Sequence, residues 1–380
     1  METREYKDSG EMISLLGFGA MRLPKMEGSQ KIDREKAGEM LDYAIAHGVN
    51  YIDTAMPYHD GDSERFLGEM LPKYPRLSYN IATKLSLMTI KVKTPKDVRE
   101  IFKGQLKRLR VDYFDYYLAH NLNSITYPQF VELGAYEFLR EKQREGIIRR
   151  IGFSYHGNVE NLKEIISQYS WDFAQIQLNY LDWESRDAKQ AYELLTANGI
   201  PVIVMEPIRG GSLAGLGGKA AGILNAANPN VSVASWALRF AASLPNVLTV
   251  LSGMSSIEQV HDNIKTMTDF RELSQMEYDT INRALEAYKL SLTVPCTGCR
   301  YCMDCNAGVD IPTIFDIYNQ YKVDGNKWVF KMISNLLCDN AQASRCVECG
   351  RCEPLCPQHI NIPGMLSKID KEYRELTSES

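Results

Sequence analysis

The chain has 380 residues, of which 44% are hydrophobic and 24% are charged, and its formal net charge is -5 at pH 7. This length exceeds an average domain of roughly 150 residues, so we expect more than one domain. No run approaches the ~18 apolar residues of a membrane span, and no basic block is present to neutralise a row of phosphates, so membrane-spanning proteins are excluded and a nucleic-acid partner is disfavoured. The charged residues 1–10 contain no apolar leader, which predicts a cytoplasmic protein.

Residues 1–290 alternate short strand-like runs with amphipathic stretches of helical length, the pattern of repeated βα units. Eight strands are predicted, at Leu15–Gly19, Asn50–Thr54, Tyr79–Lys84, Tyr113–His120, Ile148–Ser154, Phe173–Asn179, Pro201–Pro207 and Val247–Gly253. Helical patterns follow, for example at Thr94–Leu109 and Pro128–Arg144. Eight βα units in about 290 residues predict an α/β fold, a (β/α)8 TIM barrel. The alternative is a doubly wound open sheet, but no G-x-G-x-x-G sits at a strand-to-helix turn.

Ionisable side chains close three consecutive predicted strands: Asp53, Lys84 and His120, with Tyr58 in the loop after the first of them. In a TIM barrel the carboxyl ends of the strands form the active site. A neighbouring ammonium lowers the pKa of a phenol, and Lys84 could supply that charge while Asp53 holds it in place. His120 could donate a hydrogen bond to a carbonyl oxygen that gains negative charge. These four side chains predict hydride reduction of a carbonyl, with Tyr58 as general acid and base.

The same motifs resemble the aldo-keto reductase superfamily across residues 10–290. Asp53-Thr54-Ala55-x-x-Tyr58 is similar to its strand-two signature, and Lys84 and His120 complete its catalytic tetrad. The resemblance implies NADPH or NADH as hydride donor and a small-molecule carbonyl or alcohol as substrate. It also implies a set of nucleotide-binding residues: Met21, Ser154, Gln177, Met205, Pro207, Arg209, Gly210, Ser212, Leu213, Gly253, Gln259 and Asn263.

Two positions depart from the pattern of that family. Tyr155 follows Ser154 where the family usually has Asn. The family's closing segment normally carries a Lys and an Arg for a 2′-phosphate, but residues 252–256 and Gln259 offer neither charge, although Asn263 matches. The choice between NADPH and NADH therefore stays open.

All nine cysteines lie between residues 296 and 356, and residues 1–295 contain none. A chain without a secretion signal is expected in a reducing compartment, where clustered cysteines bind metal or carry out redox chemistry rather than form disulfides. The chain thus divides near residue 290, into a barrel at 1–290 and a second domain at 291–380.

The second domain contains two cysteine runs that form an internal repeat. The run Cys346-x-x-Cys349-x-x-Cys352-x-x-x-Cys356-Pro is the bacterial ferredoxin pattern for a [4Fe-4S] cluster. Four further cysteines at three-residue steps precede it, at Cys296, Cys299, Cys302 and Cys305, and helical stretches at Thr313–Tyr321 and Gly364–Tyr373 follow the two runs. The alternative metal is zinc, which commonly joins two cysteine pairs across ~12–20 residues. We predict a small, mainly α-helical, ferredoxin-like domain with two [4Fe-4S] clusters.

In ferredoxins with two clusters, the fourth cysteine of each run ligates the other cluster. This resemblance implies that Cys356 joins Cys296, Cys299 and Cys302, and that Cys305 joins Cys346, Cys349 and Cys352. The ninth cysteine, Cys338, lies in an apolar helical stripe and is interpreted as a buried structural thiol.

A hydride carries two electrons whereas a cluster passes one at a time, and three hypotheses for the whole protein follow. The barrel is an independent carbonyl reductase, with clusters that are structural or regulatory. Alternatively, a ferredoxin-like donor feeds electrons through the clusters to the barrel, where a flavin or the nicotinamide turns them into a two-electron reduction. A third hypothesis is a non-catalytic nucleotide- or redox-sensing scaffold, which the intact tetrad disfavours.

Overall fold

The structure is a computed structural model that describes residues 1–7, 9–87, 92–185, 187–216, 218–289, 293–324, 327–331, 337 and 341–378. They pack as two compact units, Met1–Pro207 with Ser235–Leu273, and Ile208–Ala234 with Ser274–Ser380. The domain boundary at residue 290 stays a prediction, and by packing residues 208–234 and 274–290 group with the C-terminal residues. Among the described residues, no helix is long and apolar enough to cross a membrane.

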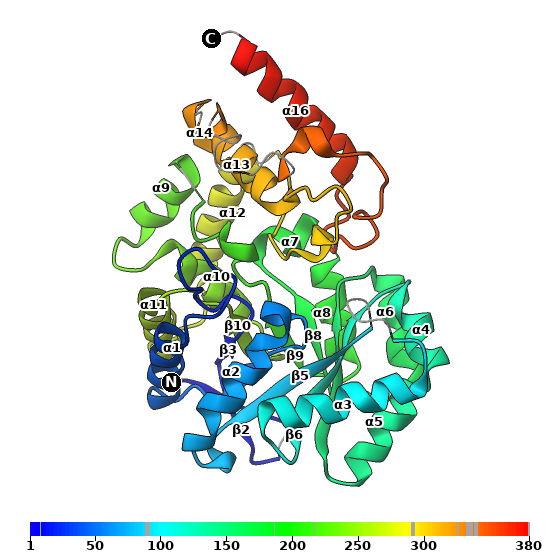
Figure 1. The fold of residues 1–380 in the computed structure, drawn as a ribbon. Helices are drawn as coiled ribbons and strands as arrows, with labels where there is room; N and C mark the ends of the chain where they lie inside the picture. The colour runs from blue at the N-terminus through cyan, green and yellow to red at the C-terminus, as the bar shows by residue number, and fades with distance from the viewer. Residues whose placement is uncertain are drawn as a thin grey trace. The chain divides into compact units, whose positions relative to one another are not determined.

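The first unit is built on a closed barrel of eight parallel strands, which confirms the predicted fold (Figure 1). Neighbouring strands pair in the order β10-β3-β4-β5-β6-β7-β8-β9. The strands are β3 Leu16–Gly19, β4 Tyr51–Asp53, β5 Asn80–Ser86, β6 Phe114–Leu122, β7 Ile148–Tyr155, β8 Phe173–Gln177, β9 Val202–Met205 and β10 Val247–Ser252. Each strand overlaps its predicted range. Because the strand order closes on itself, the alternative of an open sheet is wrong.

Helices cover the outside of this barrel, as α3 and α5 show in Figure 1. The helices that the structure describes in this unit are α1 Arg34–Ala46, α2 Asp62–Met70, α3 Pro95–Leu109, α4 Thr126–Glu132, α5 Ala135–Arg144, α6 Val159–Gln168, α7 Tyr180–Ser185, α8 Ala188–Ala197, α10 Val233–Ala242 and α11 Ile257–Thr268. Because both faces of the strands are covered, all nine residues of β6 are buried, and such strands lack the alternation of a half-exposed sheet.

Local signals fix the helix ends. Thr94 caps α3 in a capping box with Asp97, in which each side chain accepts from the other residue's backbone N–H. The single helix predicted at Pro128–Arg144 is wrong, because α4 and α5 are separate helices. Gly134 lies between them at φ 57, a left-handed conformation that glycine adopts without steric cost.

An N-terminal hairpin that the sequence analysis did not predict belongs to the first unit. Its strands, β1 Thr3–Glu5 and β2 Met12–Ser14, pair antiparallel. The Arg4 guanidinium donates to the Leu244 carbonyl at 2.9 Å and to the carbonyls of Ala242 and Val247. The hairpin is thereby hydrogen-bonded to residues near the end of the barrel sequence.

The second unit is helical. Its helices are α9 Gly218–Ala227, α12 Gln275–Lys289, α13 Ile311–Asp324, α14 Lys327–Lys331 and α16 Ile362–Ser378. Helix α9 packs against α12, although 47 residues separate Ala227 from Gln275 in the sequence. Cys338 lies outside the described residues, so its interpretation stays a prediction.

The backbone repeats between the two cysteine runs. Left-handed φ angles occur two and four residues after the first cysteine of each run, at Gly298 (67°) and Arg300 (67°) and again at Glu348 (53°) and Gly350 (71°). A third pair, Gly308 and His359, lies three residues after the last cysteine of each run. Left-handed angles are uncommon for residues other than glycine, so their recurrence in register shows that both runs fold into the same loop.

Glu372 joins the helices that follow the two runs, because it accepts hydrogen bonds from Tyr318 (2.6 Å) and Lys322. Burial alone would raise the pKa of Glu372, but the hydrogen bonds from Lys322 and Tyr318 outweigh it and the pKa is lowered. A lowered pKa in the folded state stabilises the protein above the unfolded pKa, and this contribution is lost as the pH falls through the folded value.

We therefore expect Glu372→Gln to reduce the free energy of unfolding of this unit by about 1 kcal/mol at pH 7 and by little at about pH 3. Denaturant titrations at both pH values measure the difference. The matched control is Glu375→Gln, which alters an exposed carboxylate on the same helix and is expected to change stability little at either pH. An equal loss for Glu372→Gln at both pH values would contradict the ionic interpretation.

Candidate active site and cysteine sites

The four predicted catalytic residues come together inside the first unit. Asp53 ends β4, Tyr58 begins the 3-10 helix η1 (Tyr58–Gly61), and Lys84 and His120 lie two residues before the ends of β5 and β6. The Lys84 ammonium donates to both carboxylate oxygens of Asp53, each at 2.7 Å, and to the Tyr58 hydroxyl at 3.3 Å. The rings of Tyr58 and His120 meet edge-on, with centroids 6.2 Å apart. The structure thus brings all four side chains together.

Burial controls the electrostatics of this group. Lys84 is fully buried, and burial lowers its pKa while the charge of Asp53 opposes the shift. Burial also raises the pKa of Asp53, and Lys84 opposes that shift in turn. The two groups therefore stabilise each other's charged form. Burial, followed by the charges of Lys84 and His156, lowers the pKa of His120 well below its usual value, so its imidazole is neutral at pH 7.

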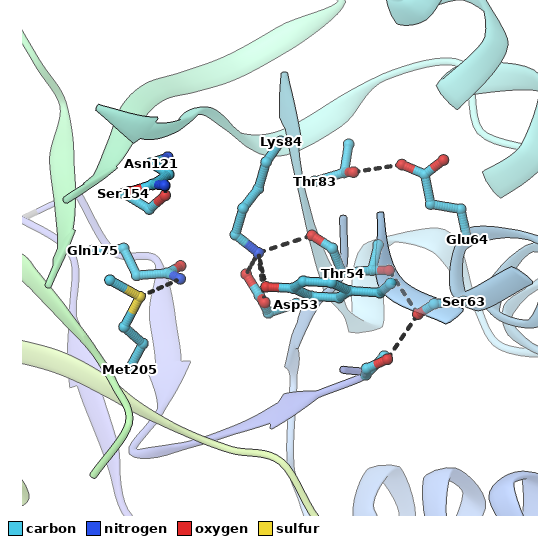
Figure 2. Close-up of polar contacts among 12 residues, drawn as sticks. Asp53, Thr54, Ser63, Glu64, Thr83, Lys84, Asn121, Ser154, Gln175 and Met205 are labelled. Atoms are coloured by element: carbon cyan, nitrogen blue, oxygen red, sulfur yellow. Dashed lines mark hydrogen bonds and ion pairs between the residues drawn. The ribbon is translucent and has the colours of Figure 1, made fainter. Parts of the chain in front are cut away.

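A network of buried hydrogen bonds surrounds the backbone next to Lys84, and Figure 2 shows the bond between Thr83 and Glu64. Glu64 is fully buried and accepts hydrogen bonds from Thr83 (2.7 Å), Gln105 (2.8 Å) and Arg108 (2.6 Å). The Gln105 amide also donates to the Lys84 carbonyl at 3.0 Å. The network joins α2 and α3 to the strand that carries Lys84 and fixes the backbone at that residue.

Sequence reasoning missed Gln105 and Arg108 because both lie in an ordinary amphipathic helix pattern. It also missed His156, whose charge acts on His120. His156 follows a predicted strand within two residues, and that position at the rim of a barrel was the available signal.

Most of the predicted nucleotide-binding residues of the first unit lie at the carboxyl ends of β7–β10 or in the loops that follow, and Met21 follows β3. Ser154 accepts a hydrogen bond from the Asn121 backbone N–H (2.7 Å), and Figure 2 shows the two side by side. The Gln177 amide donates to Asp182 (2.6 Å). Gly253 directly follows β10, whereas Gln259 and Asn263 lie in α11. Met205 ends β9, and Pro207 lies in the loop after it. Their role toward a nucleotide stays a prediction.

One cation at this rim was not predicted. The Cγ and Cδ atoms of Arg22 lie 3.4 Å from the position that a Cβ would take on Gly253, so the aliphatic part of Arg22 packs against this glycine. The Arg22 carbonyl accepts a hydrogen bond from the Ser255 hydroxyl at 2.8 Å, and the Arg22 guanidinium lies 3.8 Å from Glu206. A positive charge is therefore present beside the segment that lacks one in its own sequence.

The other four predicted nucleotide-binding residues, Arg209, Gly210, Ser212 and Leu213, belong to the second unit. Arg209 and Gly210 lie in the 3-10 helix η4 (Arg209–Gly211), and the Ser212 hydroxyl donates to the Arg209 carbonyl at 2.7 Å. The Arg209 guanidinium donates to the Pro295 carbonyl at 3.0 Å. This contact points Arg209 toward the first cysteine run.

The second unit groups its described cysteines into two sets. One pocket is lined by Cys296, Cys299, Cys302 and Cys356, together with apolar side chains that include Ile311 and Phe315. Cys352 lies close enough to Cys346, Cys305 and Cys349 for their charges to raise the pKa of its thiol. The composition of both sets agrees with the crossed arrangement that the resemblance implies, and cluster binding by these sets stays a prediction.

The donors suit iron–sulfur clusters. Burial raises the pKa of the Cys296 and Cys352 thiols to about 11 each, and coordination by iron removes such protons because metal-bound thiols are thiolates. The Gly298 backbone N–H donates to the Cys296 sulfur at 3.3 Å, a contact of the kind that tunes cluster potential. Among the residues that the structure describes, no three Cys, His, Asp or Glu side chains form a site for a single metal ion.

Comparisons with known proteins agree with both units. Residues 15–286 match the family model described as aldo/keto reductase family, and residues 295–360 match a 4Fe-4S dicluster domain. The chain is 25% identical to NADH-specific methylglyoxal reductase of Escherichia coli (67% of this chain, 90% of the relative) and 25% identical to L-galactose dehydrogenase of Arabidopsis thaliana (74% and 92%). An aldo-keto reductase of Bacillus halodurans in its holo form superposes with a TM-score of 0.61 at 27% identity, covering 75% of this chain and 96% of that one. The chain belongs to the aldo/keto reductase family of oxidoreductases and carries a 4Fe-4S domain after its barrel.

Proposed function

We propose that this protein interconverts a small-molecule carbonyl compound and its alcohol by hydride transfer with NADPH or NADH. The observation that carries the proposal is the buried Lys84 ammonium, which contacts both Asp53 (2.7 Å) and the Tyr58 hydroxyl (3.3 Å). A reductase needs a proton donor beside the carbonyl oxygen, and a charge-stabilised Tyr58 is such a donor. The names of the E. coli and Arabidopsis relatives, a reductase and a dehydrogenase, support this reaction class.

Each residue of the group has its own part in the reaction. Tyr58 gives its hydroxyl proton to the carbonyl oxygen in reduction and takes it back in oxidation. Lys84 stabilises the phenolate that remains, and Asp53 orients Lys84. Neutral His120 donates one hydrogen bond toward the same oxygen and orients the carbonyl. The nicotinamide nucleotide, when bound, supplies the hydride, and Met21, Ser154, Gln177 and Asn263 are among the residues that would hold it.

The nucleotide preference depends on the charge near the end of β10. Arg22 is the cation at that position, but Glu206 lies 3.8 Å from it and offsets its charge. The E. coli relative is NADH-specific by name, which supports NADH as the first donor to test here.

We infer that the second unit holds two [4Fe-4S] clusters, each bound by four cysteines. One is held by Cys296, Cys299, Cys302 and Cys356, and the other by Cys346, Cys349, Cys352 and Cys305. The apolar, cysteine-lined pocket and the repeated loop geometry support this assignment. The clusters, when bound, pass single electrons. Because clustered cysteines stay reduced and free to bind metal in a reducing compartment, we also propose a cytoplasmic location.

A second candidate function, in which a ferredoxin-like donor feeds electrons through the clusters, has one observation in its favour. Cys349 is exposed and its neighbour Val347 is 67% exposed. A cluster bound there would lie at the surface of its unit, where a one-electron carrier can approach it. A flavin would then be needed to combine single electrons into a hydride equivalent.

The test is an EPR spectrum of anaerobically purified protein before and after addition of NADH or NADPH, with flavin and iron assayed on the same sample and carbonyl reduction assayed in parallel. Turnover of a carbonyl substrate with clusters that respond only to dithionite would support an independent reductase. Reduction of the clusters by the nucleotide, together with bound flavin, would favour the coupled reductase. Absence of nucleotide binding and turnover would overturn the proposal.

A further inference from the structure

Arg209 is a buried cation at an unusual backbone position. Only 3% of it is exposed, and its φ of 48° is left-handed, a region that is sparsely populated by residues other than glycine. The structure maintains this conformation with two local hydrogen bonds, from the Ser212 hydroxyl to the Arg209 carbonyl (2.7 Å) and from the Leu213 backbone N–H to the Ile208 carbonyl (3.1 Å). The loop therefore holds the guanidinium in a fixed place.

That place is next to a cysteine site in the same unit. The guanidinium donates to the Pro295 carbonyl at 3.0 Å, across 86 residues of sequence. Pro295 directly precedes Cys296, and the Arg209 charge acts on the Cys296 thiol. A buried charge is costly unless an opposite charge or hydrogen bonds compensate it, and a cluster with four thiolates is a compensating anion.

We propose that Arg209 is a positioning residue that raises the reduction potential of the cluster bound by Cys296, Cys299, Cys302 and Cys356. The proposal rests on the proposed function, because it requires that cluster. On reduction the cluster gains one electron and one negative charge. A fixed cation in a poorly hydrated interior stabilises this more negative form, since Coulomb interactions there are weakly screened. Cluster potentials are set by net charge, by hydrogen bonds to sulfur and by exposure.

A negative charge also lies near Cys296, and its expected effect on the cluster potential can be compared with that of Arg209. The carboxylate of Asp316 on α13 also acts on the Cys296 thiol, with the opposite sign to Arg209. Asp316 is exposed whereas Arg209 is buried. Water screens an exposed charge, so Asp316 should act less strongly than Arg209.

The experiment is an anaerobic redox titration of the full-length, cluster-loaded protein with dithionite, monitored by EPR. We expect Arg209→Gln to lower the midpoint potential of one cluster by about 59 mV, which corresponds to a tenfold change in its ratio of reduced to oxidised form for a one-electron couple. The other cluster should not shift. Arg209→Lys keeps the charge and should lie between the wild type and Arg209→Gln, while Asp316→Asn should raise the same potential by a smaller amount.

Unchanged potentials in Arg209→Gln with full iron content would overturn the proposal, and so would equal shifts in Arg209→Gln and Arg209→Lys. If Arg209→Gln fails to load iron, Asp316→Asn decides, because the absence of an upward shift there contradicts control by charge at this cluster. A wild-type protein without [4Fe-4S] signals would instead overturn the proposed function. Iron content and the wild-type spectrum therefore separate the two failures.

Discussion

Tyr58→Phe is expected to lower kcat for carbonyl reduction by about 10²- to 10⁴-fold, the usual contribution of a general acid or base, and to leave the Kd for NADH or NADPH almost unchanged. The substitution removes the hydroxyl that lies 3.3 Å from the Lys84 ammonium and keeps the ring that packs edge-on against His120. Steady-state kinetics report the loss, and fluorescence titration of the nucleotide reports its affinity.

The matched control is Tyr136→Phe, which removes a hydroxyl that donates to the Ser170 carbonyl at 2.6 Å. Tyr136 lies on α5, on the outer layer of the barrel, so this variant should keep its kcat and lose about 1 kcal/mol of stability. Unchanged turnover in Tyr58→Phe, with normal turnover in the control, would rule out Tyr58 as the proton donor.

Paired cysteine variants are expected to show which cysteines share a cluster. Cys296→Ser with Cys356→Ser removes two ligands of one cluster in the crossed arrangement, so the protein should retain about four iron atoms per chain. Cys346→Ser with Cys356→Ser removes one ligand from each cluster and should leave almost no cluster iron. Iron and acid-labile sulfide assays after anaerobic reconstitution measure both results.

The reverse pattern would show that each run binds its own cluster. In that case Cys346→Ser with Cys356→Ser would retain about four iron atoms and Cys296→Ser with Cys356→Ser would retain almost none. The structure favours the crossed pattern because Cys356 lines the same pocket as Cys296, Cys299 and Cys302. The single variant Cys305→Ser is a further control, since both patterns predict the loss of one cluster.

Much of the barrel could be predicted because its signals are local. Buried parallel strands are short apolar runs, and their ends are marked by the change to helical periodicity. Asp53, Lys84 and His120 could be predicted as a group for a geometric reason, since strand ends in a barrel share one rim. Helix α3 was predicted almost to the residue because Thr94 and Pro95 mark its start.

The rest depends on contacts between residues that are distant in sequence. The hairpin of β1 and β2 has strands of three residues, too short for periodicity to detect, and Arg4 binds carbonyls about 240 residues away. The hydrogen bonds of Glu64 with Gln105 and Arg108 could not be found from spacing. Arg209 was predicted as a nucleotide-binding residue, whereas its observed hydrogen bond is to the Pro295 carbonyl.

The packing of α9 against α12 has a consequence for synthesis on the ribosome. Helix α9 leaves the exit tunnel before its partner does, because Gln275 follows Ala227 by 48 positions. Until α12 emerges, the side chains that α9 buries, Ala220 and Leu224, have no helix of their own unit to cover them. The barrel strand β10 is translated in that interval. Exposed apolar surface on nascent chains promotes misassembly, so the apolar face of α9 needs protection during that interval.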